Sequence, residues 1–387
     1  MAWHHLQYAL GLAQLGHDVY FVEDSDDYPS CYDPTRLKTD VDPSYGLGFA
    51  ADVFTRVGLG ERWTYYDAHT TSWLGPCASR IADVFATAEV LLNVSGVNPL
   101  RPWLMQVPRR VLIDTDPAFT QIRHLTNPEA HSRASAHTEF FSFGENIHSS
   151  SSEVPDDGFQ WTPTRQPIVL DAWPVTPGPP NGRFTTVMVW EAYKPLQYAG
   201  RSYGLKSTSF GPYLEMPSRA ASQFEVALGS PPAPRQVLRD HGWSVRNPLH
   251  PTRDLWAYQD YIRSSKAEFS IAKEGYVVTR SGWFSDRSAA YLASGRPVVT
   301  QETGFSDNIP IGEGLFSFST LDEAVAAVEE VESRYDFHCR AARAVAEEYF
   351  DSRNILASLI DNVTASAIPS AKRTAQSSSI GSFTSTA

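Results

Sequence analysis

The chain has little of what stabilises secreted proteins or anchors membrane proteins. Only three of its 387 residues are cysteines, and the wide spacing of Cys31, Cys77 and Cys339 fits neither a disulfide framework nor a zinc site. A reducing cytoplasm is therefore the expected compartment. No run of about 18 apolar residues is present, so no integral membrane segment is expected. The opening residues show no basic region followed by an apolar stretch, which predicts no secretory signal.

Basic residues are also in short supply. Lysine and arginine together number 32, against 44 aspartates and glutamates, which gives a formal net charge of −12. A chain with this balance is a poor partner for the phosphate backbone of DNA or RNA, so no nucleic-acid partner is expected. A nucleotide ligand is still compatible with it, because such a ligand needs only a few local donors. The length and the 42% hydrophobic content suffice for two domain cores.

What the chain does contain is an alternation of helical and strand patterns. Apolar residues between positions 6 and 13 recur at helical spacing and predict an opening helix, which a strand over 18–23 follows. A domain of this type normally begins with a strand and a glycine-rich turn, so we expect the first sheet to lack its first strand. Further predicted strands are 89–94, 110–113, 139–143, 184–189, 269–272, 276–278 and 297–300. Further predicted helices are 79–88, a helix with a capping box at Thr320 and Glu323, 334–349 and 352–363.

This alternation is typical of α/β proteins with parallel sheets. The proline-rich segment 156–183 shows little periodicity and marks the join between two domains. We expect residues 1–165 to form an N-terminal domain, 166–350 a C-terminal domain and 351–365 a C-terminal helix. Residues 366–387 are rich in serine and threonine with few apolar anchors, and we expect them to be disordered.

The most informative segment is Val277–Thr300, VVTRSGWFSDRSAAYLASGRPVVT. It reads as a short strand, a Ser-Gly turn, a helix capped by Ser285, a Gly-Arg-Pro stop and another strand. The turn Ser281–Asp286 would aim free backbone N–H groups at one point. A helix N-terminus of this kind attracts phosphate through its donors and its dipole. The segment therefore predicts a phosphate site at the turn.

Five stretches carry a family resemblance, and they are WHHLQYALGLAQLGHDVYFVED, DTDPAFTQ, TPTRQPIVLDAWP, YGLKS and SGWFSDRSAAYLASGRPVV. Together they resemble bacterial glycosyltransferase-like proteins of the GT-B type, diffusely and over most of residues 3–359. The resemblance implies two Rossmann-like domains whose parallel sheets face a cleft. It implies an N-terminal domain that takes the acceptor and a C-terminal domain that takes a nucleotide sugar. The expected activity is hexosyltransferase-like, with a nucleotide-diphosphate sugar as substrate, an unknown acceptor hydroxyl and no cofactor.

Two positions depart from the family pattern. Retaining relatives commonly carry two glutamates separated by seven residues, and this chain has Gly282 and Ala290 at those positions. Inverting relatives carry a His-Gly-Gly start and a glutamate at the later site, which the chain matches only in part. That later glutamate normally holds the donor ribose, so the contact must come from elsewhere or be absent. The sequence therefore does not determine the stereochemistry.

Glycosyl transfer requires neutralisation of the charge on the leaving diphosphate. Lys273 follows a predicted strand, Arg287 lies one turn into the capped helix, and Lys206 belongs to a Gly-Leu-Lys loop. Lys273 is also compatible with a solvated lysine, Arg287 could equally pair with Asp286 or Glu302, and a surface charge is the commoner explanation of Lys206. Related enzymes bind sugar hydroxyls in the loop that holds Glu302 and Thr303. The predicted donor-binding residues are Lys206, Lys273, Ser281, Gly282, Trp283, Ser285, Asp286, Arg287, Glu302 and Thr303.

Inverting transfer also requires a base on the acceptor hydroxyl. His4 and His5 stand at the start of the first predicted helix, and an imidazole titrates near neutrality. At most one of these adjacent side chains would serve, and Asp114 or Asp116 could orient it. The predicted catalytic residues are His4, His5 and Asp114. The Asp-x-Asp pattern is also a metal–diphosphate motif, but three residues are a weak signal, and no metal is predicted.

Three functions remain open from the sequence. The leading one is a nucleotide-diphospho-sugar glycosyltransferase. The second is a nucleotide-sugar epimerase of the same architecture, which would need several carboxylates and histidines in the cleft. The third is a non-catalytic sugar-nucleotide-binding protein, which the missing strand and the missing glutamates favour.

Overall fold

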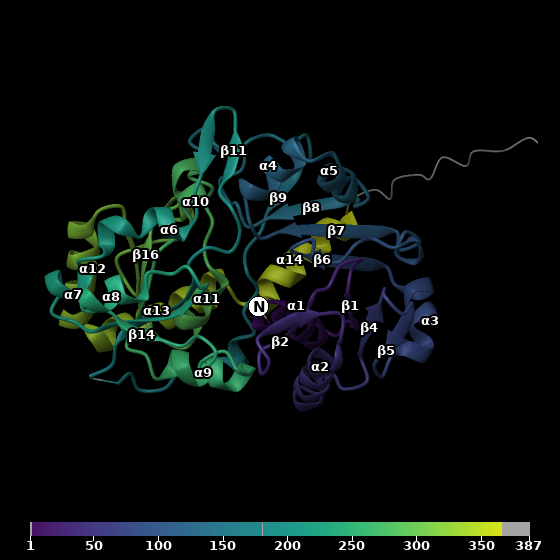
Figure 1. Ribbon diagram of the computed structural model, residues 1–387, viewed down its shortest axis with the longest axis horizontal. Coiled ribbons are helices and arrows are strands. Elements are labelled where there is room, and N and C mark those ends of the chain that lie inside the picture. Colours follow the sequence, from purple (N-terminus) through teal and green to yellow (C-terminus); the bar gives the residue numbers. More distant parts are fainter. Residues whose placement is uncertain (1, 180, 366–387) are drawn as a thin grey trace, which may run out of the picture.

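The computed structural model describes residues 2–179 and 181–365, which form two α/β lobes placed side by side (Figure 1). The first lobe contains α1 (Ala2–Gln14), β1 (Phe21–Asp24), β2 (Cys31–Asp33), β3 (Lys38–Asp40), α2 (Ser44–Arg56), β4 (Trp63–Asp67), β5 (Ser72–Leu74), α3 (Ile81–Thr87), β6 (Val90–Val94), β7 (Arg109–Asp114), α4 (Phe119–Thr126), α5 (Pro128–Ser135), β8 (Glu139–Ser142) and β9 (Trp161–Pro163). It also receives the last helix, α14 (Ser352–Ala365).

The second lobe contains the elements from the next strand to the penultimate helix. They are β10 (Phe184–Val189), β11 (Leu196–Tyr198), β12 (Arg201–Tyr203), α6 (Lys206–Ser209), α7 (Met216–Arg219), β13 (Phe224–Gly229), α8 (Arg235–Asp240), β14 (Ser244–Arg246), α9 (Leu255–Arg263), β15 (Ala267–Ser270), α10 (Glu274–Thr279), α11 (Asp286–Ala293), β16 (Val298–Gln301), β17 (Leu315–Phe318), α12 (Leu321–Ser333) and α13 (Tyr335–Tyr349). Short 3₁₀ turns occupy Ala78–Arg80, Pro102–Leu104, Leu170–Ala172, Gly211–Tyr213 and Phe305–Asp307.

The six-stranded sheet of the second lobe fixes where a ligand should bind. Its order is β14-β13-β10-β15-β16-β17 with every neighbouring pair parallel, and its central strands β13, β15 and β16 are almost wholly buried. In order of appearance along the chain this is 3-2-1-4-5-6, so the winding reverses between β10 and β15. Doubly wound sheets bind ligands outside the carboxyl ends of the strands at this reversal. The expected site is therefore next to Val189 and Ser270.

The first lobe contains two larger sheets, besides the two-stranded antiparallel sheet of β2 and β3. The orders of the larger sheets are β1-β4-β5 and β6-β7-β8-β9, and in them β5 alone runs antiparallel to its neighbour. In this lobe β1 and β6 are edges of separate sheets. Asn98 bonds to the free edge of β1, donating to Val22 O over 2.9 Å and accepting from Asp24 N over 3.2 Å.

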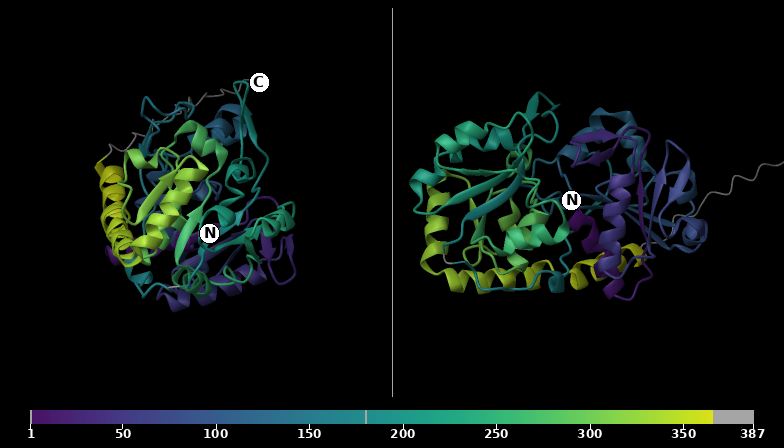
Figure 2. Two further views of the ribbon diagram at one scale, coloured as in Figure 1. Left: turned by 90° about the vertical axis from the view of Figure 1, so that its left-hand side faces the viewer. Right: turned by 60° about the horizontal axis from the view of Figure 1, so that its bottom comes forward.

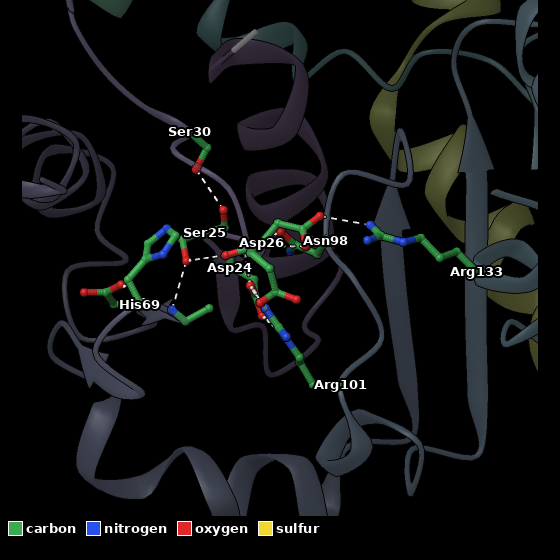
Figure 3. A network of polar contacts seen from close by, with 11 residues as sticks. Asp24, Ser25, Asp26, Ser30, His69, Asn98, Arg101 and Arg133 are labelled. Atoms are coloured by element: carbon green, nitrogen blue, oxygen red, sulfur yellow. Dashed lines mark hydrogen bonds and ion pairs between the residues drawn. The ribbon is translucent and has the colours of Figure 1, made fainter. Parts of the chain in front are cut away.

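A network of hydrogen bonds and ion pairs lies at the carboxyl end of β1. Two guanidinium nitrogens of Arg101 donate to the carboxylate of Asp24 over 2.9 and 3.0 Å, and Arg133 donates to the carboxylate of Asp26 over 2.9 Å (Figure 3). The side chains of Asp24 and Asp26 are largely buried, so their charges need these partners. The network therefore stabilises the loop that leaves β1.

The last two helices connect the lobes. Figure 2 (right) shows α13 and α14 following each other along the underside of the molecule, from the second lobe to the first. In the first lobe α14 packs on α1 and shares a core with β6 and β7. The approach is so close that a Cβ added at Gly11 would lie 2.5 Å from Leu356 Cδ1. Gly11 thus lets the two helices touch.

Most predicted elements are confirmed to within a few residues, including strand 184–189 and the capping box of Thr320 and Glu323. The predicted strand 276–278 is wrong, because these residues belong to the helix α10. A short β-branched run does not distinguish a strand from a helix turn. Here the Thr279 hydroxyl donates to Gly275 O over 2.7 Å. The helix ends at Thr279, and the next residue, Arg280, has a left-handed backbone conformation. The predicted disordered tail, 366–387, lies outside the described residues.

Candidate functional site

Three cations gather where the winding of the second sheet reverses. Lys206 opens α6, Lys273 follows β15, and Arg287 lies in the first turn of α11. Burial, reinforced by the charges of Arg287 and Lys273, holds the pKa of Lys206 well below its ordinary value. Within residues 2–179 and 181–365, the Lys206 ammonium has neither a hydrogen bond nor an ion pair. A partly buried cation beside two others is a site that attracts an anion.

Arg287 is held in place by the strands on either side of the reversal. Its guanidinium donates to Val187 O of β10 over 2.8 Å and to Ser270 Oγ of β15 over 2.6 Å, and its Nε pairs with Glu268. The Glu268 side chain is wholly buried. The donors of this guanidinium are therefore largely taken up by the protein.

Lys273 reaches across to the first lobe. Its ammonium donates to Asp116 Oδ1 over 2.7 Å and to the Tyr193 hydroxyl over 2.8 Å. Tyr193 in turn donates to Asp116 Oδ2 over 2.6 Å, and Tyr276 also donates to this carboxylate. The loops that follow β7, β10 and β15 thus meet at one carboxylate between the lobes.

The turn Ser281–Asp286 does not offer the row of free donors that the sequence predicts. Gly282 N donates to Thr303 O over 2.8 Å, and Ser281 N donates to Tyr276 O over 3.3 Å. A Cβ at Gly282, whose φ is +78°, would lie 2.7 Å from Asn146 N of the first lobe. The expectation of free N–H groups at Ser281 and Gly282 is therefore wrong, because this part of the turn is packed against a loop from the other half of the chain.

The neighbouring predicted residues brace the same turn. Trp283 stacks on Tyr276 with ring centroids 4.3 Å apart, and its indole N–H donates to Thr115 O over 3.2 Å. The Thr303 hydroxyl donates to Trp283 O, and the Glu302 carboxylate accepts from Gly304 N. These contacts hold the loop together, and a role of these side chains toward a donor sugar stays a prediction.

The second half of the turn faces the other lobe. Ser285 caps α11 as predicted, with its hydroxyl accepting from Arg287 N over 3.2 Å. Asp286 follows, and its Oδ2 lies 3.8 Å from His4 Nδ1. Burial acts to raise the pKa of Asp286, but the neighbouring His4 and Arg287 outweigh it and hold the pKa below its ordinary value. Asp286 is thus an ionised carboxylate beside His4.

Both predicted histidines are neutral near pH 7. Burial lowers the pKa of His4, against the attraction of Asp286, and lowers the pKa of His5 to about 3. The buried His4 Nε2 has no hydrogen-bond partner in the described chain. Of the two, His4 has the features of a base, since one nitrogen is near a carboxylate and the other is unused.

Asp114 has partners other than a histidine. It accepts from Thr120 Oγ1 over 2.6 Å, from Ser142 Oγ over 2.7 Å and from Gln121 Nε2 over 3.1 Å. Burial raises its pKa, and these hydrogen bonds oppose the rise. Asp114 therefore holds the start of α4 to β7 and β8, and the carboxylate beside His4 is Asp286 instead.

A small cavity lies between α1 and α11. Its lining comes from both lobes and from the segment that joins them, and consists of Trp3, His4, Gln7, Gln166, Pro167, Ile168, Trp173, Tyr258, Asp286, Arg287 and Ala290. Its volume of about 20 Å³ is the room that one water molecule requires. A nucleotide diphosphate is far larger, so a donor enters here only if the side chains or the lobes move apart.

Several residues of this region are not among those that the sequence predicts. They include Tyr193 and Tyr276, and the sequence predicts Asp286 as a donor-binding residue and not as the partner of His4. Tyr193 follows β10 as Lys273 follows β15, so the strand order would have indicated it.

No group of three or more His, Cys, Asp or Glu side chains in the described part of the chain is arranged to hold a metal ion. Likewise, no described helix is both long and apolar enough to cross a membrane.

Neither a protein-family model nor a curated protein matches the sequence. Solved structures do match. An α-glucosyltransferase in complex with UDP and a 13-mer DNA is 11% identical with a TM-score of 0.54, over 94% of this chain and 95% of that one. HepE from Anabaena in complex with UDP-glucose is 10% identical with a TM-score of 0.53, over 90% and 100%.

Sucrose-phosphate synthase from Thermosynechococcus elongatus is 10% identical with a TM-score of 0.52, over 93% of this chain and 92% of that one. Identities this low establish the fold alone. The two lobes with parallel sheets, matched over nearly their whole length, therefore give this chain the GT-B fold of the glycosyltransferases.

Proposed function

We propose that the protein is a glycosyltransferase that moves a sugar from a nucleotide-diphosphate donor to an acceptor hydroxyl. The observation that carries the proposal is the group of Lys206, Lys273 and Arg287 at the point where the second sheet reverses its winding. Ligands of doubly wound sheets bind at this point, and a diphosphate requires cations there. Two structures of the same fold were solved with UDP or UDP-glucose, which supports the donor class.

We assign the main contact with the diphosphate to Lys206. It is the cation of the three that has no counterion among the described residues, whereas Arg287 is paired with Glu268 and Lys273 with Asp116. A bound phosphate would restore the charge that burial disfavours at Lys206. Arg287 and Lys273 then add to the positive potential around the leaving group.

We assign the role of base to His4. As the bond between the acceptor oxygen and the anomeric carbon forms, the bond from that carbon to the phosphate oxygen breaks. His4 Nε2 takes the acceptor proton, and Asp286 stabilises the imidazolium that results. The nucleoside diphosphate departs with its charge balanced by Lys206. This role applies to the inverting course of the reaction.

One observation favours a second candidate, a sugar-nucleotide-binding protein without turnover. Ala290 lines the cavity at the position where relatives carry a ribose-binding glutamate, and the cavity has room for a single water molecule. Donor binding in the absence of donor cleavage would select this candidate. An epimerase would need several carboxylates and histidines, whereas one histidine and one carboxylate line the cavity.

The donor site is tested by replacing Lys206 with methionine. We expect the affinity for UDP to fall by about 1–3 kcal/mol, the range for a charge-assisted hydrogen bond. The melting temperature without ligand should not fall, because Lys206 makes no ion pair that the substitution could break. Titration calorimetry and thermal unfolding measure the two quantities.

Lys194→Met is the matched control, since Lys194 is an exposed lysine of the same lobe. Its affinity for UDP should equal that of the unmodified protein. If Lys206→Met binds UDP as tightly as Lys194→Met does, Lys206 is not part of the donor site.

A further inference from the structure

The carboxylate of Asp116 accepts hydrogen bonds from several donors, most of which belong to the opposite lobe. Asp116 belongs to the loop after β7, and it accepts from Lys273, Tyr193 and Tyr276 of the second lobe. Arg123 of its own lobe adds a bond of 2.9 Å. Burial alone would raise the pKa of Asp116, but Lys273 and Arg123 outweigh it and hold the pKa below its ordinary value. An ionised carboxylate is therefore clamped by four donors.

Lys273 is confined on its other sides by aromatic rings. Its ammonium lies 4.7 Å from the ring centroid of Tyr193, 4.9 Å from that of Phe119 and 5.2 Å from that of Tyr276. These distances are within the range of cation–π attraction. Apart from the Tyr193 hydroxyl, Asp116 is the polar partner of this ammonium in the described chain. Its carboxylate is thus the counterion of this ammonium.

Two of the three N–H donors of Lys273 are used by Asp116 and Tyr193, so a second anion would compete with Asp116 for this ammonium. We propose that Asp116 is an internal substitute for the donor diphosphate, which competes with the ligand for Lys273 and closes the lobes when no donor is present. The proposal rests on the donor site proposed above. In this closed state the cavity beside Arg287 has room for one water molecule, and the bond between Lys273 and Asp116 is one of the contacts between the lobes that an entering donor would release. Donor affinity is then reduced by the cost of breaking the contact between Asp116 and Lys273.

The variant Asp116→Asn keeps the shape of the side chain and removes its charge. We expect it to bind inorganic pyrophosphate and UDP about tenfold more tightly than the unmodified protein, because Lys273 becomes available. Its melting temperature without ligand should be lower, because a buried ion pair between the lobes is lost. A merely structural role for Asp116 would lower stability without tightening the binding of an anion.

Asp307→Asn is the matched control. Asp307 also joins the lobes, through Asn146 over 3.1 Å, and pairs with Arg280 at the surface, away from Lys273. Its substitution removes the same net charge, and we expect it to change pyrophosphate affinity by less than about twofold. In Asp116→Asn/Lys273→Met the gain in affinity should disappear. A gain that persists without Lys273, or that Asp307→Asn reproduces, would show a general charge effect and overturn the inference.

The outcomes separate this inference from the proposed function. If Asp116→Asn binds pyrophosphate no more tightly than the unmodified protein while Lys206→Met still weakens UDP binding, the competition is ruled out and the donor site stands. If neither the unmodified protein nor Asp116→Asn binds pyrophosphate or UDP, both are overturned.

Discussion

Replacing Arg287 with methionine is expected to lower the free energy of unfolding by about 3–5 kcal/mol, the usual cost of removing one partner of a buried ion pair. Glu268 is wholly buried, one of its oxygens bonds to Arg287, and the other has no partner in the described chain. Without the guanidinium its charge would be stranded in the core of the second sheet. Urea denaturation measures the change.

Two further variants show whether the stranded charge is the cause. The double variant Arg287→Met/Glu268→Gln lacks both charges of the pair. It should therefore recover much of the free energy of unfolding that Arg287→Met loses. Arg280→Met removes an arginine from a surface pair with Asp307 and should cost at most about 1 kcal/mol. If Arg287→Met and Arg280→Met lower the free energy of unfolding equally, the ion pair of Arg287 with Glu268 stabilises the protein no more than a surface pair does.

Replacing His4 with glutamine is expected to lower the rate of donor cleavage by about 10²- to 10⁴-fold, the typical contribution of a general base. The affinity for UDP should not change, because His4 belongs to α1 of the first lobe, whereas the proposed donor site lies in the second lobe. The release of nucleoside diphosphate from a panel of nucleotide sugars, with water as the acceptor, measures the rate without knowledge of the natural acceptor. His5→Gln is the matched control and should retain nearly full activity.

The dependence of this rate on pH follows from the environment of His4. A base must be neutral to take a proton, and burial lowers the pKa of His4 below 6.5. Activity should therefore persist as the pH falls through 6.5 and decline only at a more acidic pH, where His4 becomes protonated. A decline centred near pH 6.5 or above, or equal losses in His4→Gln and His5→Gln, would contradict the assignment.

The fold could be predicted because its signals are local. Strand 184–189 is a continuous run of strand-forming residues, and Thr320 with Glu323 is a capping box that needs only four neighbouring positions. The error at 276–278 has the same origin. Three β-branched or aromatic residues in a row favour a strand. In the structure they form part of the helix α10, and the Tyr276 ring packs against Phe119 and Trp283, which a local pattern does not include.

The candidate site was predictable only in part, because its geometry depends on contacts between distant segments. Lys206, Lys273 and Arg287 could be named as residues at strand or helix ends, but their mutual proximity depends on the strand order. The backbone donors of the turn could not be judged from the sequence. Thr303 uses one of them, and Asn146, which lies more than 130 positions away, covers Gly282.

The partner of His4 was missed for the same reason. Asp114 lies closer to it in the sequence, whereas Asp286 lies beside it in space, at the N-terminus of a helix of the other lobe. A sequence pattern records spacing along one segment. It carries no information on which carboxylate a neighbouring lobe brings to within 4 Å.

A crystal structure of the protein with bound UDP is the most direct test of the account. We expect the diphosphate to lie outside the carboxyl ends of β10 and β15, within hydrogen-bond distance of Lys206 Nζ, with Lys273 turned from Asp116 toward the phosphate. A diphosphate bound away from Lys206, or against the first lobe alone, would contradict it.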